Sequence, residues 1–258
     1  MEAWRLVVSP AASGPWNMAL DQALVESVAA RQRAPTLRFY TWARPTLSIG
    51  YAQPIANVDL QTAAASGVPV VRRRTGGQAI LHDDELTYAL TLPRAHALAG
   101  SGIIDSYAAL SQGLLAGLDL LGVRAEIGRW SPPAGQQVDD ICFASPSGHE
   151  VLAAGRKIVA SAQCRLKGAV LQHGSIVLSH NADVYRLFGL SPRRPPDGLR
   201  ACLAGPVTVG GLIQLFAQGF ATALNVDLTP ADPSSAEDTR TQKLVRVRYA
   251  DDAWLHRC

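Results

Sequence analysis

The chain has 258 residues, 48% of them hydrophobic, which is enough for one large domain or two small ones with a sizeable core. Its formal net charge is only +3, so the charge balance neither indicates a nucleic-acid-binding protein nor requires an acidic partner. We expect neither a membrane span nor a secretory signal, because no apolar run approaches about 20 residues and the amino terminus lacks a basic region followed by an apolar one.

Four cysteines lie at positions 142, 164, 202 and 258 and show neither a CxxC pair nor the spacing of zinc ligands. A disulfide scaffold would be unusual for a domain with this much apolar sequence, so we expect reduced thiols in a cytoplasmic protein. The same spacing predicts no metal site.

The first part of the chain is predicted to contain short strands and two helices. Residues 4–8 form a strand, and Asn17 is the expected N-cap of a helix that runs to about Ala30. In this helix apolar residues repeat every four positions, and Asp21 falls outside that stripe. After it the pattern predicts strands at 36–42 and 46–51, a helix at 58–66 ended by Gly67, a strand at 68–73 that leads into Gly76-Gly77, and a strand at 85–92 stopped by Pro93.

A longer helix and a hairpin are predicted next. The helix covers residues 103–121, where the apolar residues form one stripe and Gly122 follows the end. Residues 130–140 are loop by composition. The remaining segments are a hairpin of 150–163 and 168–178, helical stretches at 184–187 and 209–224, a mobile segment at 229–239 rich in Pro, Ser, Asp and Glu, and a short closing helix or turn around Trp254.

The order of these elements favours an α+β fold. Strands are grouped early and in the middle of the chain, helices lie between and after them, and there is no internal repeat or regular βαβ alternation. We therefore expect one mixed β-sheet with flanking helices, formed by residues 1–258 as a single domain.

Two segments that contain glycines at turn positions give the strongest indications of function. The first, RRRTGGQAILH at 72–82, combines three arginines with adjacent glycines. Glycines let a backbone approach a ligand closely, and arginines supply fixed positive charge and many N–H donors. From composition alone, a turn between two strands with a solvated basic run explains this segment equally well.

The second segment runs from Cys142 to Ser175. Cys142 lies in a polar, turn-prone loop, whereas a structural cysteine is usually embedded in an apolar strand or helix. Lys157 lies in an apolar strand, where an ammonium without a partner is costly, although a lysine on an edge strand also discourages aggregation. Arg156 should face the other side of the sheet, toward solvent. Together the two segments suggest a site that grips an elongated acyl group and acts at its carbonyl.

The other candidates have ordinary structural explanations. His82 alone is typical of a hydrogen-bonded structural histidine, and His173 could support the site without touching the reacting atoms. Cys164 falls in an alternating strand, Cys202 precedes a helix, and Cys258 is terminal, so we assign none of these three a catalytic role.

The stretches RRRTGGQAILHDDELTYAL and CFASPSGHEVLAAGRKIVASAQCRLKGAVLQHGSIVLS resemble the biotin/lipoate protein ligase and octanoyltransferase superfamily. The resemblance extends to GPWNMALDQAL and TLRFYTWARPTLSIGYAQ and so covers nearly the whole chain. Within the superfamily it is closest to the cysteine-dependent octanoyl-[acyl carrier protein]:protein N-octanoyltransferases. It implies a mixed sheet of the biotinyl/lipoyl ligase–transferase type, in agreement with the order of the elements.

The resemblance also implies roles for individual residues. Cys142 lies in a Cys-Phe…Pro-Ser motif and matches the family's nucleophile. Lys157 lies in a Gly-Arg-Lys motif and matches a lysine of the family that points at the reacting carbonyl. The resemblance implies that its charge would favour a thiolate and stabilise negative charge on the carbonyl oxygen. The residues expected to bind the acyl group or substrate are Arg72, Arg73, Thr75, Gly76, Gly77, His82, His173 and Gly174.

An octanoyltransferase and an ATP-dependent lipoate–protein ligase would share most of these residues. His149-Glu150 stands where ligases usually have Asn-Asp, Gln78 replaces their third glycine, and the chain ends near Trp254 with no room for the accessory domain of many ligases. These differences favour the transferase.

The implied reaction moves octanoyl from octanoyl-acyl carrier protein through Cys142 to a lysine of a lipoyl domain or glycine-cleavage H protein. It needs no ATP or metal and involves no nucleic acid or membrane. A lipoate–protein ligase and a non-catalytic protein that binds acyl-carrying or lipoylated partners remain the alternatives. A biotin ligase fits less well, because RRRTGG does not reproduce the Gly-Arg-Gly-Arg turn of that branch.

Overall fold

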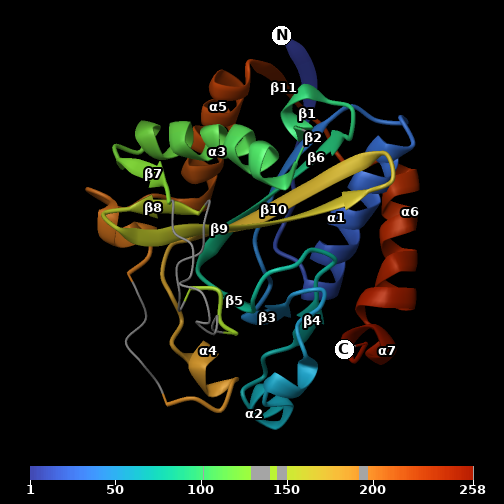
Figure 1. The fold of residues 1–258 in the computed structure, drawn as a ribbon, viewed down its shortest axis with the longest axis vertical. Coiled ribbons are helices and arrows are strands. Elements are labelled where there is room, and N and C mark those ends of the chain that lie inside the picture. Colours follow the sequence, from blue (N-terminus) through green and yellow to red (C-terminus); the bar gives the residue numbers. More distant parts are fainter. Residues whose placement is uncertain (101, 129–139, 144–149, 192–196, 258) are drawn as a thin grey trace.

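The computed structural model describes residues 1–258 except 101, 129–139, 144–149, 192–196 and 258. Among the described residues, the largest feature is an eight-stranded mixed sheet in the order β11-β1-β2-β6-β10-β9-β8-β7 (Figure 1). Its strands are β1 (Glu2–Val8), β2 (Thr36–Tyr40), β6 (Glu85–Pro93), β7 (Ala125–Ile127), β8 (Val151–Ala153), β9 (Arg156–Leu166), β10 (Ala169–Val177) and β11 (Val226–Pro230). The predicted α+β fold with a mixed sheet is confirmed.

A small second sheet carries the first glycine segment. It contains β3 (Thr46–Ile49), β4 (Val70–Arg72) and β5 (Ile80–His82) in the order β4-β3-β5, with β4 parallel and β5 antiparallel to β3. The glycine turn, residues 73–79, connects β4 to β5. The predicted strand-to-turn arrangement is therefore present, but β5 was not expected from the sequence, because only three residues pair.

Helices cover both faces of the main sheet (Figure 1). The helices are α1 (Gly14–Ala29), α2 (Leu60–Ala65), α3 (Ile103–Leu120), α4 (Asp183–Arg186), α5 (Val209–Leu224), α6 (Ser235–Leu244) and α7 (Asp252–Leu255), with a π-helical turn at Val245–Tyr249 and 3-10 turns at Ile55–Asn57, Ala97–Ala99 and Leu199–Cys202. Helices α3 and α5 pack with one face in a core around Phe39, Tyr88, Phe216 and Phe220. Helix α1, with α6 beside it, packs on the other face.

Helix α1 begins earlier than the sequence predicts. Its N-cap is Ser13, whose hydroxyl accepts from the Trp16 N–H, and Pro15 follows in the first turn, where its missing N–H costs nothing. The expected cap, Asn17, lies inside the helix and uses its side chain to bind backbone carbonyls outside it. Asp21, expected off the apolar stripe, is buried because α1 is covered on nearly all sides.

The prediction of a mobile segment at 229–239 is wrong. Residues 226–230 form β11, which pairs in parallel with β1, and α6 follows. A capping box begins this helix, because the Ser234 hydroxyl accepts from the Glu237 N–H and the Glu237 carboxylate accepts from the Ser234 N–H. Arg5 of β1 then binds Glu237 with two hydrogen bonds, which ties α6 to the sheet.

The predicted hairpin of 150–163 and 168–178 contains one strand more than expected. Ala154 and Gly155 have positive φ, +49° and +73°, and form a tight turn that separates β8 from β9. Most of the predicted loop at 130–140 lies outside the described residues. No helix in the described ranges is long and apolar enough to cross a membrane.

Candidate active site

Cys142 lies at the end of a short backbone bridge to the glycine turn. Ala79 and Ile141 form an isolated parallel bridge, in which the Ala79 N–H donates to the Asp140 carbonyl at 2.8 Å and the Cys142 N–H donates to the Ala79 carbonyl at 2.9 Å. Gln53 holds the same peptide, because its side-chain amide donates to the Asp140 carbonyl at 2.9 Å. The thiol is thus fixed by main-chain bonds beside the turn rather than by a helix or a long strand.

Lys157 reaches the cysteine from β9 in the main sheet. Its Nζ lies 3.1 Å from Cys142 Sγ and 2.5 Å from the Cys142 carbonyl oxygen, and it forms an ion pair with Glu150, which directly precedes β8. Burial alone would lower the pKa of Lys157, but the charges of Cys142 and Glu150 raise it above the ordinary lysine value. The lysine is therefore a buried ammonium that lies directly beside the Cys142 sulfur.

Beside this pair lies a narrow pocket with a cavity volume of about 30 Å³. Its wall is mostly apolar or backbone. The described residues that line it are Met18, Tyr40, Trp42, Arg73, Gly77, Ile80, His82, Thr87, Cys142, Ala160, Ser161, Ala162, His173, Gly174 and Ser175. Such a lining suits a hydrocarbon chain, because transfer of the chain out of water is favourable and the chain needs no hydrogen-bond partners along its length.

Arg73 is a buried cation in the wall of this pocket. Its two terminal nitrogens donate to the carbonyls of Ser48, Gly76 and Gln78 and to the Ser48 hydroxyl, so the guanidinium fixes the glycine turn. Burial lowers the pKa of Arg73 to about 10, which still leaves it charged near neutral pH. Its Nε–H is buried and has no hydrogen-bond partner in the described structure.

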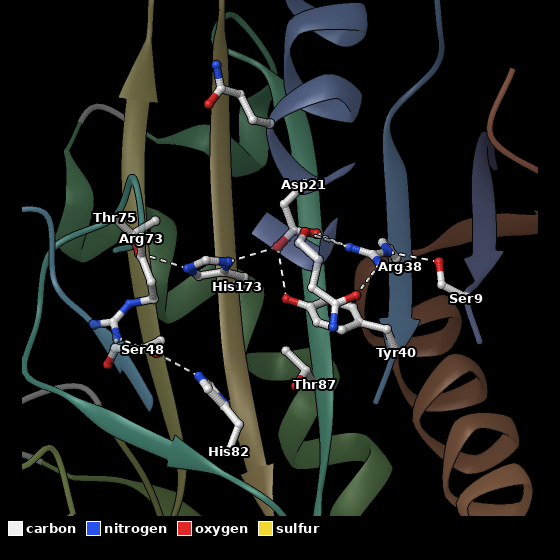
Figure 2. A network of polar contacts seen from close by, with 12 residues as sticks. Ser9, Asp21, Arg38, Tyr40, Ser48, Arg73, Thr75, His82, Thr87 and His173 are labelled. Carbon is white, nitrogen blue, oxygen red and sulfur yellow. Dashed lines mark hydrogen bonds and ion pairs between the residues drawn. The ribbon is translucent and has the colours of Figure 1, made fainter. Parts of the chain in front are cut away.

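His82 connects Arg73 to the buried carboxylate of Glu85. Figure 2 shows the contact of His82 with Ser48, beside Arg73. His82 Nε2 lies 2.7 Å from the Ser48 hydroxyl, which also accepts from Arg73, and His82 Nδ1 lies 2.8 Å from Glu85. Burial lowers the pKa of His82 despite Glu85, so its imidazole is neutral near neutral pH. Trp42 stacks on the His82 ring with centroids 3.9 Å apart, and both side chains line the pocket.

His173 forms a second chain of this kind on β10 (Figure 2). Its Nδ1 lies 2.9 Å from the Asp21 carboxylate and its Nε2 lies 2.7 Å from the Thr75 hydroxyl. Burial would raise the pKa of Asp21, but Arg38 and His173 lower it, so the carboxylate stays ionised. Asp21 also accepts from Arg38 at 2.6 Å and from Tyr40 at 3.0 Å. This network holds Thr75, and with it the glycine turn, against the main sheet.

The structure brings together most of the residues singled out in the sequence. Cys142, Lys157 and Arg73 meet at the pocket, which Gly77, His82, His173 and Gly174 also line. Of the described cysteines, Cys142 is the one in the pocket wall, and Cys164 lies in β9, as expected.

Arg72, Thr75 and Gly76 are not among the lining residues. Arg72 points away from the pocket and donates to the carbonyls of Gly50, Tyr51, Gln53 and Leu255. Thr75 acts through its bond to His173. Arg156 faces the other way from Lys157 and pairs with Asp197 at 3.0 Å on the surface, as its strand position predicted.

Three buried carboxylates in and around the candidate site were missed from the sequence. Glu150 was considered only as a difference from ligases, and its pairing with Lys157 depends on the unforeseen β8–β9 turn. Asp21 and Glu85 were assigned no role, although an acidic residue inside an apolar helix, or at the start of an apolar strand, was the available signal.

Comparisons with known proteins agree with this geometry. A family model described as the lipoyl protein ligase A/B catalytic domain matches residues 13–221. The chain is 37% identical to the octanoyltransferase LipM of Brevibacillus brevis, over 98% of this chain and 99% of that protein. It is 33% identical to the octanoyltransferase LipM of Staphylococcus aureus, over 99% of each.

Two solved structures share the fold at lower identity. Lipoate-protein ligase A bound with ATP superposes with a TM-score of 0.78 at 22% identity, over 98% of each chain. The bi-partite lipoate protein ligase of Thermoplasma acidophilum, described with its E2 lipoyl domain, gives 0.79 at 20% identity, over 98% of this chain and 96% of that one. From the family match and the full-length relatives above 30% identity, the chain belongs to the lipoyl protein ligase A/B catalytic-domain family.

Proposed function

We propose that this protein is an octanoyltransferase of lipoate biosynthesis, an acyltransferase that carries octanoyl on Cys142 before passing it to a lysine of another protein. The observation that carries the proposal is the 3.1 Å contact between Cys142 Sγ and Lys157 Nζ beside an apolar pocket. Relatives named octanoyltransferase over the full length of the chain support the same activity.

In the first half-reaction the Cys142 thiolate attacks the thioester carbonyl of octanoyl-acyl carrier protein. A C–S bond to Cys142 forms, the C–S bond to the carrier breaks, and the carrier thiolate leaves and takes a proton from water. One thioester replaces another, so the step is near balance and needs no ATP. The pocket holds the hydrocarbon chain and orients the carbonyl toward Sγ.

In the second half-reaction a lysine of a lipoyl domain or glycine-cleavage H protein attacks the Cys142 thioester after losing one proton to water. The C–N bond forms, the C–S bond breaks, and its electron pair returns to Sγ as the thiolate. The nitrogen releases its extra proton to water. This step runs downhill because an amide is far more stable than a thioester, and Lys157 stabilises the charge on the carbonyl oxygen.

The other site residues receive supporting roles under this proposal. Arg73, Gly77, His82, His173 and Gly174 form the acyl pocket. Arg72, Thr75 and Gly76 shape the turn from behind, as their hydrogen bonds and positions suggest. The enzyme then works as a single catalytic domain in the cytoplasm, without ATP or a metal.

The test is the intact mass of the protein after mixing with octanoyl-acyl carrier protein in the absence of ATP. We expect a gain of one octanoyl group, no gain in Cys142→Ala, and a normal gain in Cys164→Ala. The second variant is a matched control, because burial raises the pKa of the Cys164 thiol to about 11 and leaves it unreactive near neutral pH.

Two results would contradict the proposal. An octanoyl adduct that still forms in Cys142→Ala would mean that another residue carries the acyl group. The absence of any adduct, with ATP-dependent transfer of free octanoate to a lipoyl domain, would identify a ligase.

A further inference from the structure

Every N–H of the Lys157 ammonium has an acceptor. Two point to Cys142, at Sγ (3.1 Å) and at the carbonyl oxygen (2.5 Å), and the third forms the ion pair with Glu150. The lysine and the glutamate are 6% and 7% exposed, so water competes little for these contacts. While Cys142 is a thiolate, the ammonium lies between two negative charges.

Acylation of Cys142 changes this balance. The sulfur becomes part of a neutral thioester, and the N–H that pointed to it loses its anionic acceptor. Among the described residues, Glu150 is then the remaining acidic side chain paired with Lys157. A buried ammonium with no anionic partner would tend to lose its proton, because burial favours the neutral form.

The other titratable groups described around this cluster, namely His180, Tyr107 and Arg73, do not supply that negative charge. His180, which follows β10, packs edge-on against Phe143, and burial and the Lys157 charge lower its pKa to about 4, so it is neutral near pH 7. Burial raises the pKa of the Tyr107 hydroxyl on α3, so it is neutral as well. Arg73, from the glycine turn, adds positive charge.

We propose that Glu150 is a positioning residue that keeps Lys157 an ammonium while Cys142 carries the acyl group. The N–H released by the sulfur then donates to the carbonyl oxygen of the Cys142 thioester. Lys157 thus acts as a fixed cation in the second half-reaction and not as the base for the incoming amine, whose protons go to water. The identity of the acyl group rests on the proposed function, whereas the link between Glu150 and the charge of Lys157 does not.

The chain offers a direct measurement, because its only lysines are Lys157, Lys167 and Lys243. With lysine labelled with ¹³C at the ε carbon, an NMR titration follows three signals, and Lys157→Arg assigns the relevant one. Cys142→Ala stands in for the acyl-enzyme in one respect, since it removes the thiolate charge. The titration is recorded for this variant with and without Glu150→Gln, which keeps the side-chain shape and removes its charge.

In Cys142→Ala we expect Lys157 to remain protonated through neutral pH. Adding Glu150→Gln should weaken the proton binding of Lys157 at least about tenfold, because the buried ammonium loses the last anionic partner that the described residues provide. Glu150→Asp in the same background should restore part of the affinity. The matched control is Glu126→Gln, which neutralises an exposed carboxylate on β7 and should leave the titration unchanged.

An unchanged Lys157 titration in the double variant Cys142→Ala/Glu150→Gln would overturn the proposal, since the charge of Glu150 would then not control the lysine. This readout involves no octanoyl donor, so it fails or succeeds independently of the proposed function. A second test keeps Cys142 intact and measures the rate at which the preformed acyl-enzyme transfers octanoyl to hydroxylamine as the pH is raised. This rate should begin to fall at a lower pH in Glu150→Gln than in the parent protein. An identical pH profile would also contradict it.

Discussion

Gly77 occupies the most constrained position of the glycine turn. Its φ is +87°, in the left-handed region that favours glycine, and its carbonyl oxygen packs so tightly on Gly50 that a Cβ on Gly50 would lie 1.9 Å away. Gly76, one residue earlier, has open space where a Cβ would be and needs no positive φ. The two adjacent glycines therefore have different physical reasons to be there.

This difference predicts different effects of alanine at the two positions. Gly77→Ala should slow octanoyl-enzyme formation by tenfold or more, because about 1–3 kcal/mol of backbone strain would be relieved by shifting the turn beside Cys142. Gly76→Ala should leave the rate within about twofold. The rate of adduct formation measured by intact mass checks both, and equal loss in the two variants would argue against a role for the turn's backbone shape.

Single residues were predictable from the sequence where local context carried the information. The polar loop around Cys142 and the apolar strand around Lys157 marked both as unusual. What the sequence could not provide was the contact between them, because it depends on the bridge between Ala79 and Ile141 and on the β8–β9 turn. The sequence also carried no sign that Arg72 points away from the pocket, since its acceptors are backbone carbonyls from two segments far apart in the chain, residues 50–53 and Leu255.

Among the elements, α3 and α5 pack closely on each other through glycines. A Cβ on Gly117 of α3 would lie 2.4 Å from the Phe216 ring, and one on Gly113 would lie 2.0 Å from the Phe220 ring. A Cβ on Gly219 of α5 would lie 2.3 Å from the backbone nitrogen of Gly117. Glycines on both helices thus let two phenylalanines enter the contact, which closes the core on this face of the sheet.

Alanine at Gly117 should therefore destabilise the protein even though alanine is the better helix former. Overpacking costs about 1–3 kcal/mol, and the gain in helix propensity is only about 0.5–1 kcal/mol. Gly210→Ala, in the first turn of α5 with open space around it, should be neutral or stabilising. Urea unfolding of both variants is the measurement, and a stabilised Gly117→Ala protein would mean that the two helices separate at little cost.

The long elements could be predicted because their patterns are local. The stripe of α3 and the apolar runs of β6 and β10 were found with small errors at the ends, whereas the strand predicted at 150–163 is divided into β8 and β9. Shorter elements were missed or misplaced where a distant partner creates them. β11 exists because β1 pairs with it, and α6 was obscured by a polar composition that suits its exposed face and its capping box.

At the scale of the whole molecule, Asp21 joins parts of the fold that are far apart in sequence. From α1 it binds Arg38 and Tyr40 on β2 and His173 on β10, and through His173 it reaches Thr75 in the glycine turn (Figure 2). Its carboxylate is buried, so the fold depends on its charge being matched by Arg38.

Asp21→Asn should lower the free energy of unfolding by about 3–5 kcal/mol at pH 7, because it leaves Arg38 buried without its counter-charge. The pKa of Asp21 is lowered in the folded protein, so its contribution is complete above the ordinary value of 3.8 and is lost as the pH falls through the folded value. The difference in the free energy of unfolding between the parent protein and Asp21→Asn should stay constant from pH 7 to 5 and become smaller below about pH 4. Chemical unfolding across this range checks it, and a gap that closes already above pH 5 would show that other groups dominate.

The α+β class followed from the order of the elements, but their spatial arrangement did not. The predicted hairpin already placed β10 beside β9. Nothing in the local sequence places β6 on the other side of β10, or puts α1 and α3 on opposite faces of the sheet. The family resemblance supplied that arrangement, because it carries information about a whole fold that periodicity in one chain lacks.

The ion pair between Lys157 and Glu150 also bears on how the enzyme survives its own chemistry. A thioester on Cys142 would lie within reach of a lysine nitrogen, and acyl migration from sulfur to that nitrogen would form a stable amide and destroy the site. An ammonium has no lone pair with which to attack. Under the role proposed for Glu150, the carboxylate that keeps the proton on Lys157 would also direct the acyl group to a lysine of the acceptor protein instead of Lys157.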